Sequence, residues 1–175
     1  MNALEALELG HQSVMDAIKD LPQADWDKTI TREAWTIKDV IAHLASHEHI
    51  MIDVLRASFH GGSVPVWSRW MQGASKFDRE EVARRRVASP AQVLREYTEA
   101  HLETINLLIR VPSAAQEWVG LLPWYGVEYA VADFPFVLGS FYGHKLAHSA
   151  QIAASRNLIP VSSTPQLKFQ PLLSA

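Results

Sequence analysis

The chain lacks cysteine altogether among its 175 residues. A disulfide framework, a thiolate nucleophile and a cysteine-ligated metal site are therefore excluded. Long apolar runs are also missing: the longest, from Tyr129 to Tyr142, is interrupted by Asp133 and Pro135 and is too short to cross a bilayer. The first residues, MNALEALELG, carry acidic groups and no basic stretch, unlike a signal peptide. We therefore expect a cytoplasmic protein that does not bind membranes.

Basic charge is scarce as well. The formal net charge is −3 with histidine neutral, and the one dense basic run is Arg84–Arg86. Because Asp78, Glu80 and Glu81 precede that run, it is typical of a solvated helix face. Nucleic-acid binding usually needs a basic surface, so we expect no nucleic-acid partner. Hydrophobic residues make up 48% of the chain, which is enough for one well-filled core.

Strand patterns are poor, whereas apolar residues recur with helical spacing in four segments. These segments cover residues 2–21, 36–59, 89–110 and 133–157. Thr36 is a candidate N-cap, with Asp39 in the first turn. Ser89 is another, with Pro90 at the first helical position and Gln92 completing a capping box. Four amphipathic segments of this length predict an all-α fold, a four-helix bundle.

Two long connections separate the predicted helices. Residues 60–88 lie between the second and third helices and include a short predicted helix over 78–86. Residues 111–132 lie between the third and fourth. Long connections of this kind can wall a pocket. We expect one domain over residues 1–160, followed by an irregular tail over 161–175.

The segment GHKLAHSAQI places His144 and His148 four residues apart in the fourth helix. Such residues lie about 40° apart around the helix axis, so both imidazoles project from one face. Phe141 and Ile152 share that face, which therefore points towards the core. The two histidines either hydrogen-bond to other buried groups or chelate a divalent metal ion.

Titratable residues also occur on the inner faces of the other predicted helices. His43 and His47 lie four residues apart in the second helix, and Glu48 falls within its apolar stripe. His11 and His101 occupy core positions of the first and third helices. Helices that face one another in a bundle can combine such ligands into one site. That site is either a catalytic centre with open coordination positions or a closed structural one.

Two motifs resemble those of the DinB-like four-helix-bundle superfamily. WTIKDVIAHL, followed by Glu48, resembles the second-helix signature, and GHKLAHSAQI resembles the fourth-helix HxxxH signature. FDREEVARRRVASPAQVLREY resembles the region ahead of the third helix. The resemblance covers residues 3–158. It implies a four-helix bundle that assembles as a homodimer.

In metal-binding members of this superfamily, one histidine of the second helix and both histidines of the fourth hold a divalent ion, often nickel or zinc. Matched residue by residue, the implied ligands are His43, His144 and His148. His47 stands where relatives often carry tryptophan, and it either replaces His43 or supports it. Glu48 either orients a ligand histidine or pairs with an unrelated group, and near the metal it would serve as a catalytic general base.

The resemblance also implies a class of reaction. Characterised relatives include transferases and isomerases that use mycothiol, bacillithiol or glutathione. We therefore expect an enzyme whose metal activates water or a low-molecular-weight thiol for attack on a small electrophile. The alternatives are a stress-related protein that sequesters a small toxic molecule or metal without turnover, and a bundle whose histidines only pack.

Overall fold

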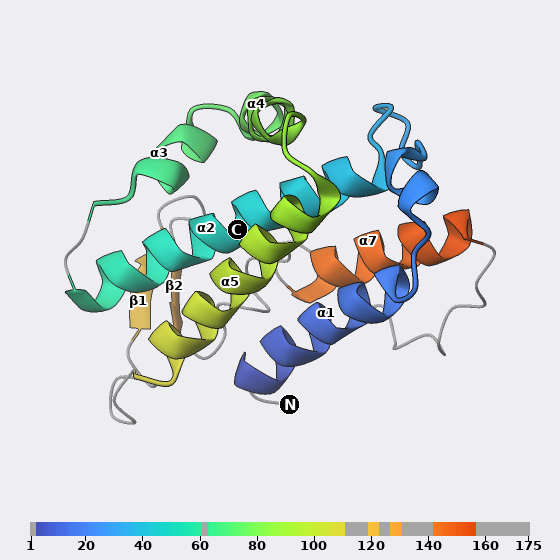
Figure 1. Cartoon of the computed structure of the whole chain (residues 1–175). Helices are drawn as coiled ribbons and strands as arrows, with labels where there is room; N and C mark the ends of the chain where they lie inside the picture. Colours follow the sequence, from blue (N-terminus) through green and yellow to red (C-terminus); the bar gives the residue numbers. More distant parts are fainter. Residues whose placement is uncertain (1–2, 61–62, 111–118, 123–126, 131–141, 157–175) are drawn as a thin grey trace, which may run out of the picture.

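The computed structural model describes residues 3–60, 63–110, 119–122, 127–130 and 142–156. Its elements, in chain order, are α1 (Ala3–Ile18), the 3-10 helix η1 (Gln23–Asp27), α2 (Ile37–His60), α3 (Pro65–Met71), α4 (Ala74–Arg85), α5 (Pro90–Leu108), β1 (Val119–Leu122), β2 (Val127–Ala130) and α7 (Tyr142–Ser155) (Figure 1). No helix in the described ranges is long and apolar enough to cross a membrane.

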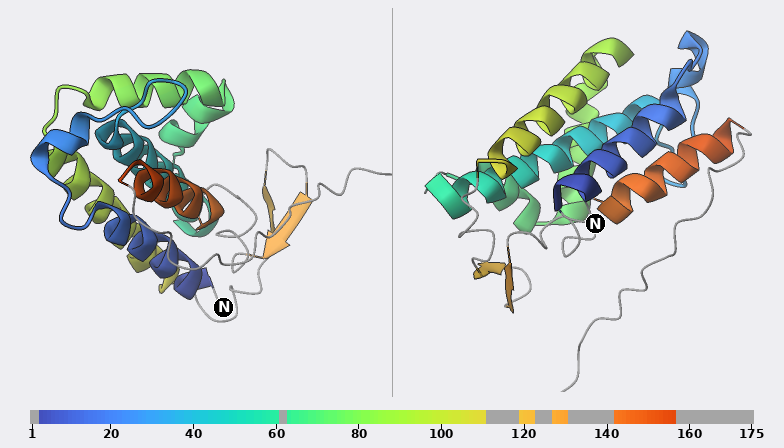
Figure 2. Two further views of the ribbon diagram at one scale, coloured as in Figure 1. Left: turned by 90° about the vertical axis from the view of Figure 1, so that its right-hand side faces the viewer. Right: turned by 90° about the horizontal axis from the view of Figure 1, so that it is seen from below.

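The four long helices α1, α2, α5 and α7 form the predicted bundle. α2 packs along α5, and α1 packs along α7, so the bundle consists of two helix pairs (Figures 1 and 2). The sequence did not predict the two-stranded antiparallel hairpin, in which Val119 pairs with Ala130. Strands of four residues are too short to produce a clear period-two pattern.

Both predicted helix starts are confirmed by their hydrogen bonds. The Asp39 amide donates to Thr36 Oγ1 at 3.1 Å, and the Thr36 amide donates to Asp39 Oδ2 at 3.2 Å. Ser89 and Gln92 form the same reciprocal capping box at the start of α5. Because the Thr36 cap fixes where α2 begins, it also fixes where His43 lies, two turns further on.

The core contains two apolar clusters with a polar layer between them. One cluster includes Leu7, Met51 and Leu108, and the other includes Val14, Ile41, Val93 and Ile152. Along α1, α2 and α5, polar residues occupy the positions between these clusters: His11, His47, Glu48, His101 and Thr104. These buried polar groups therefore lie at one level of the bundle. His43 lies one turn before His47, flanked by Ala42 and Leu44 of the second cluster.

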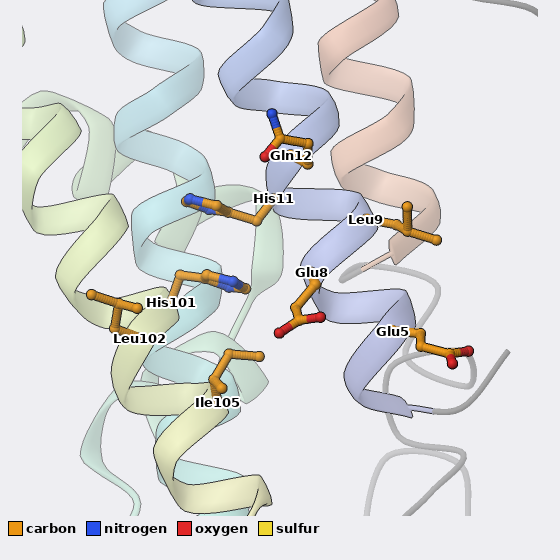
Figure 3. A pocket seen from close by; sticks show the side chains of 8 residues that line it. All are labelled: Glu5, Glu8, Leu9, His11, Gln12, His101, Leu102 and Ile105. Atoms are coloured by element: carbon orange, nitrogen blue, oxygen red, sulfur yellow. The ribbon is translucent and has the colours of Figure 1, made fainter.

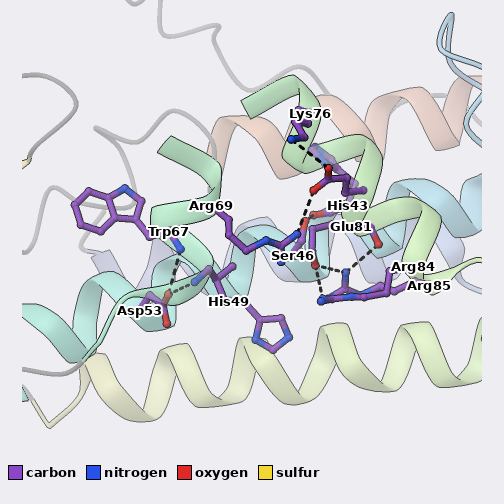
Figure 4. A network of polar contacts seen from close by, with 12 residues as sticks. His43, Ser46, His49, Asp53, Trp67, Arg69, Lys76, Glu81, Arg84 and Arg85 are labelled. Carbon is purple, nitrogen blue, oxygen red and sulfur yellow. Dashed lines mark hydrogen bonds and ion pairs between the residues drawn. The ribbon is translucent and has the colours of Figure 1, made fainter. Parts of the chain in front are cut away.

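The connection between α2 and α5 contains two helices, α3 and α4, where the sequence predicted a single short one over 78–86. Figure 4 shows Glu81 of α4 paired with Arg69 of α3 and with Arg84 and Arg85 of its own helix. Arg85 Nη1 lies 2.6 Å from Glu81 Oε2, and Arg85 Nη2 lies 2.6 Å from Glu96 Oε1 on α5. Backbone amides at the start of α3 donate to Asp53 on α2. These contacts fix the place of α4 over α2.

Three predicted features fall partly or wholly outside the described residues. These are the start of the fourth helix near Asp133, the domain boundary at residue 160 and the irregular tail over 161–175. Within the described residues, the first bundle helix ends at Ile18, where the sequence predicted an end near residue 21.

Candidate metal centre

Three histidine nitrogens from two helices meet in the polar layer. His43 Nε2 on α2 lies 2.9 Å from His144 Nε2 on α7, and His148 Nε2 lies 2.8 Å from the same atom. His43 is buried, with 4% of its surface exposed, whereas His144 and His148 are half-buried. The residues that the family resemblance matched to metal ligands therefore come together in space, with α7 forming the more open side.

Hydrogen bonding alone does not satisfy this arrangement. An imidazole nitrogen carries either one proton or one lone pair in the ring plane, so it makes one good hydrogen bond. His144 Nε2 has two nitrogen neighbours at hydrogen-bonding distance. A cation shared by the three nitrogens accounts for their convergence, because each lone pair then has the same partner.

Neighbouring oxygen atoms orient two of the rings. His148 Nδ1 lies 2.8 Å from Gln151 Oε1, an acceptor that requires a proton on Nδ1. His43 Nδ1 lies 3.4 Å from Asp78 Oδ1. A proton on Nδ1 leaves the lone pair on Nε2, so both rings present a lone pair towards His144. This orientation by groups behind the ring is common for metal-binding histidines.

The pKa values of these imidazoles favour the neutral, ligating form. Burial lowers the pKa of His43, and Asp78 only partly offsets that effect. Burial, followed by the nearby His43, lowers the pKa of His148 to about 4. At neutral pH these rings need not lose a proton before they bind a cation.

The donor set fits a borderline divalent metal. Imidazole nitrogen suits zinc, nickel, copper and iron, with metal–nitrogen distances near 2.0–2.1 Å for zinc. Ligands around a tetrahedral ion are then about 3.3 Å apart. One nitrogen from each of the three histidines lies within 4.8 Å of the others. Small rotations of the rings would widen the two short contacts to the ligand spacing of about 3.3 Å.

Asp78 is a residue of this site that the sequence did not single out. It comes from α4, and its Oδ1 lies 3.2 Å from His47 Nε2 as well as 3.4 Å from His43 Nδ1. Burial alone would raise the pKa of Asp78, but its contacts with His43 and His47 outweigh burial and hold it below its usual range. Only the packing of α4 across α2 reveals this carboxylate, because no local motif marks it.

Glu48 belongs to a separate group of contacts. Its carboxylate accepts hydrogen bonds from Lys145 Nζ and, at 2.9 Å, from Thr104 Oγ1, and it lies 3.3 Å from His101 Nδ1. Glu48 is fully buried, and 2% of Lys145 is exposed. None of these described partners is one of the three converging histidines.

The carboxylate of Glu48 is held in its ionised form. Burial acts to raise its pKa, but Lys145 and then His101 outweigh burial, and the pKa of Glu48 falls to about 2. A carboxylate with this pKa is a weak proton acceptor at neutral pH. The ion pair between Glu48 and Lys145 joins α2 to α7, the two helices that carry the converging histidines.

His11 and His101 stack against each other at the floor of an open groove between α1 and α5. Their ring centroids are 4.0 Å apart and the rings are parallel to within 1°. Burial, followed by the neighbouring His101, lowers the pKa of His11 to about 3. The groove encloses about 750 Å³ and is lined by Glu5, Glu8, Leu9, His11, Gln12, His101, Leu102 and Ile105 (Figure 3). Neither histidine contacts the three converging nitrogens.

The fold and the order of its helices define a DinB-like four-helix bundle, as the two helix signatures predicted. More narrowly, the chain belongs to the mycothiol maleylpyruvate isomerase N-terminal domain family, whose model matches residues 7–137. The match includes His43, Glu48 and Asp78 and ends before His144 and His148. No curated protein matches the sequence significantly.

Two solved structures share the fold at low sequence identity. One is a mutant of the mycothiol-dependent maleylpyruvate isomerase, with 13% identity and a TM-score of 0.61 over 93% of this chain; the match spans 61% of the isomerase chain. The other is YfiT from Bacillus subtilis, described as a probable metal-dependent hydrolase with an unusual four-helix bundle topology. It shows 16% identity and a TM-score of 0.58 over 90% of this chain and 87% of its own.

Proposed function

We propose that this protein is a divalent-metal-dependent enzyme whose ion is held by His43, His144 and His148. The observation that carries the proposal is the convergence of three ring nitrogens. His43 Nε2 lies 2.9 Å from His144 Nε2, and His148 Nε2 lies 2.8 Å from the same atom. Zinc or nickel suits three imidazole ligands. When bound, such an ion supplies Lewis acidity that lowers the pKa of a bound water or thiol.

The remaining residues would hold this centre in a reactive arrangement. Asp78 and Gln151 would keep the protons of His43 and His148 on Nδ1, so that both Nε2 lone pairs stay available. Because His144 and His148 are half-buried, a nucleophile and a small electrophile would approach from the α7 side. Three protein ligands leave room for them in the coordination sphere.

The nucleophile that we favour is a low-molecular-weight thiol. The family takes its description from a mycothiol-dependent isomerase, and one similar fold belongs to such an enzyme. Water is the alternative, which the description of YfiT as a probable hydrolase supports. Activity assays of the zinc-loaded protein with and without added thiol distinguish the two.

The role of Glu48 as a general base stays a prediction. Its fully buried carboxylate is paired with Lys145, whereas Asp78 is the ionised carboxylate in contact with His43. If Glu48 transfers protons, Glu48→Gln abolishes turnover even in variants that retain the metal. If Asp78 does so, Asp78→Asn has that effect.

Metal analysis of protein purified without a histidine tag tests the proposed centre. We expect bound zinc or nickel in the wild type and a lower metal content in His43→Ala and in His148→Ala. His49→Ala is the matched control, because His49 lies on α2 but pairs with Glu96 on α5. Metal content that is the same in all four proteins would overturn the proposal.

A non-catalytic role in sequestering a small molecule is the second candidate. The groove between α1 and α5 favours it, because that groove offers a binding surface remote from the three histidines. Stoichiometric protection without turnover, and independent of metal, would support this role. Assembly as a homodimer also stays a prediction, which light scattering on the untagged protein tests.

A further inference from the structure

The second ring nitrogen of His43 faces a separate set of ligand atoms. While Nε2 points to His144, Nδ1 lies 3.4 Å from Asp78 Oδ1, and that oxygen lies 3.2 Å from His47 Nε2. The three atoms lie within 4.8 Å of one another. They come from one turn of α2 and from α4, which the ion pair between Arg85 and Glu96 ties to α5.

Their separations match a shared cation, although His47 Nε2 also lies within hydrogen-bonding distance of Asp78 Oδ1. Nitrogen-to-oxygen hydrogen bonds have a typical length near 2.9–3.0 Å, and charge-assisted ones are shorter. Ligands around a tetrahedral zinc ion are about 3.3 Å apart. The two contacts of Asp78 Oδ1, at 3.2 and 3.4 Å, lie on either side of that value. His43 Nδ1 is moreover buried and makes no hydrogen bond of good geometry with a described residue, its contact with Asp78 Oδ1 being 3.4 Å long.

Burial makes this set different from an ordinary surface cluster. Of the whole residues, 4% of His43 and 7% of His47 are exposed, whereas Asp78 remains half-buried and reachable by solvent. A buried polar atom without a good hydrogen bond is costly. Two imidazole nitrogens and one carboxylate oxygen are ligands that zinc and cobalt accept.

We infer that His43 Nδ1, His47 Nε2 and Asp78 Oδ1 form a second divalent-cation site, which shares His43 with the three-histidine centre. The imidazole of His43 would then bridge two ions, one on each ring nitrogen. The inference rests on the proposed function for the first ion only. It explains why a second histidine lies one turn after His43, and why α4 brings a carboxylate to it.

The proton balance of this step is defined. A bridging imidazole has lost both ring protons, so the second ion displaces the Nδ1 proton of His43, which passes to the buffer. His47 keeps its proton on Nδ1 and offers Nε2, and Asp78 is already ionised. Binding of the second ion therefore releases one more proton than binding to neutral imidazoles alone.

Zinc titration of the untagged, metal-free protein tests the inference. We expect two zinc ions per chain in the wild type and one in His47→Ala and in Asp78→Asn. Because Asp78→Asn preserves the shape of the side chain, it serves where His47→Ala fails to fold. Glu80→Gln is the matched control on α4, since Glu80 is exposed and pairs with Arg69 and Lys76; it should keep both ions.

The outcomes separate this inference from the proposed function. One zinc ion in the wild type, lost in His148→Ala and kept in His47→Ala and Asp78→Asn, would overturn the second site and leave the three-histidine centre intact. Asp78 would then act only as a hydrogen-bond acceptor for His43 and His47. One ion kept in His148→Ala but lost in Asp78→Asn would overturn the three-histidine centre instead.

Proton release and cobalt spectra provide further readouts. In calorimetry with buffers of different ionisation enthalpy, the second ion should release one proton in the wild type. Two cobalt ions bridged by one imidazole should be magnetically coupled, and Asp78→Asn should remove that coupling. Two cobalt ions without coupling would show that His43 does not bridge them.

Discussion

The polar layer contains two clusters that lie side by side on α2 yet are completed in different ways. In the histidine cluster (His43, His47, His144, His148 and Asp78), ring nitrogens face other ring nitrogens. In the ion-pair cluster (Glu48, Lys145, His101 and Thr104), one carboxylate faces three groups that can donate hydrogen bonds to it. In the second cluster, protein atoms alone balance the charge of the carboxylate, whereas we propose that a cation completes the first.

The comparison also shows how one cluster supports the other. Each bundle pair packs mainly within itself, α2 with α5 and α1 with α7. The ion pair from Glu48 to Lys145 crosses between the pairs, one residue after His47 and one after His144. It therefore sets how α2 and α7 lie along each other at the level of the converging histidines.

Breaking the ion-pair cluster should have the largest effect on stability. Lys145→Met leaves the buried carboxylate of Glu48 without its cation, and we expect a loss of about 3–5 kcal/mol in the free energy of unfolding. Urea unfolding measures it, with Lys19→Met as the control, since Lys19 is exposed and lies just after the end of α1. The double variant Glu48→Gln with Lys145→Met should recover most of the loss; no recovery would mean that packing, not charge, explains the effect.

At neutral pH, breaking the histidine cluster should lower the free energy of unfolding mainly when metal is present. With zinc at 100 times its dissociation constant, we expect about 2.7 kcal/mol of added stability in the wild type. His148→Ala should remove most of that increment while changing the metal-free protein little, because His148 is half-buried. Unfolding with and without a chelator measures both values. An equal zinc effect in the two proteins would contradict the proposed centre.

Lowering the pH should remove the stabilisation from the two clusters in two different pH ranges. His148 has a folded pKa of about 4 against 6.5 unfolded, so below pH 6.5 the unfolded state binds more protons. Metal-free stability should therefore fall by up to about 1.4 kcal/mol per pH unit between pH 6.5 and 4. Substituting His148 by Ala should flatten this slope.

Glu48 acts in a lower window, because its pKa is about 2 when folded and 4.5 when unfolded. Its stabilisation is present above pH 4.5 and is lost as the pH falls towards 2. Unfolding measured across both windows in wild type, His148→Ala and Glu48→Gln separates the contributions. A slope above pH 4.5 that depends on Glu48 would contradict the assignment.

A smaller effect should come from two glycines that differ in their distance from the ion-pair cluster. A Cβ at Gly10 would lie 3.2 Å from Lys145 Cδ, whereas a Cβ at Gly143 would meet nothing described within 4 Å. Alanine favours helix over glycine by up to about 1 kcal/mol. Gly143→Ala should therefore stabilise, and Gly10→Ala should stabilise less or destabilise, since the amine of Lys145 is fixed. Equal thermal shifts would show that Lys145 is free to move.

Much of the helical architecture could be predicted from local sequence. The capping pairs at Thr36 and Ser89 depend on residues three positions apart, and both are confirmed. The facing of His144 and His148 follows from helical periodicity alone. The hairpin could not be predicted, because strands of four residues leave no periodic signal. The additional helix in the α2–α5 connection, α3, likewise has only seven residues.

The candidate site was less predictable. The helical pattern of α2 did not choose between His43 and His47, and the family resemblance favoured His43. In the fold both rings lie 4.8 Å from the ring of His144, but it is His43 whose Nε2 lies 2.9 Å from His144 Nε2. Glu48 was singled out for its place in an apolar stripe, yet its partner Lys145 was not. Asp78 had no signal at all, because its role depends on how α4 crosses α2.

The amino-acid sequence by itself therefore determined the helices, their starts and which residues share a face, because those features depend on neighbours within four positions. Only the tertiary structure decided which imidazole of α2 meets α7, and which carboxylates stand beside it. The rotation and register of one helix against another arise from packing over the whole core and from buried pairs such as Glu48 with Lys145. No stretch of sequence contains that information locally.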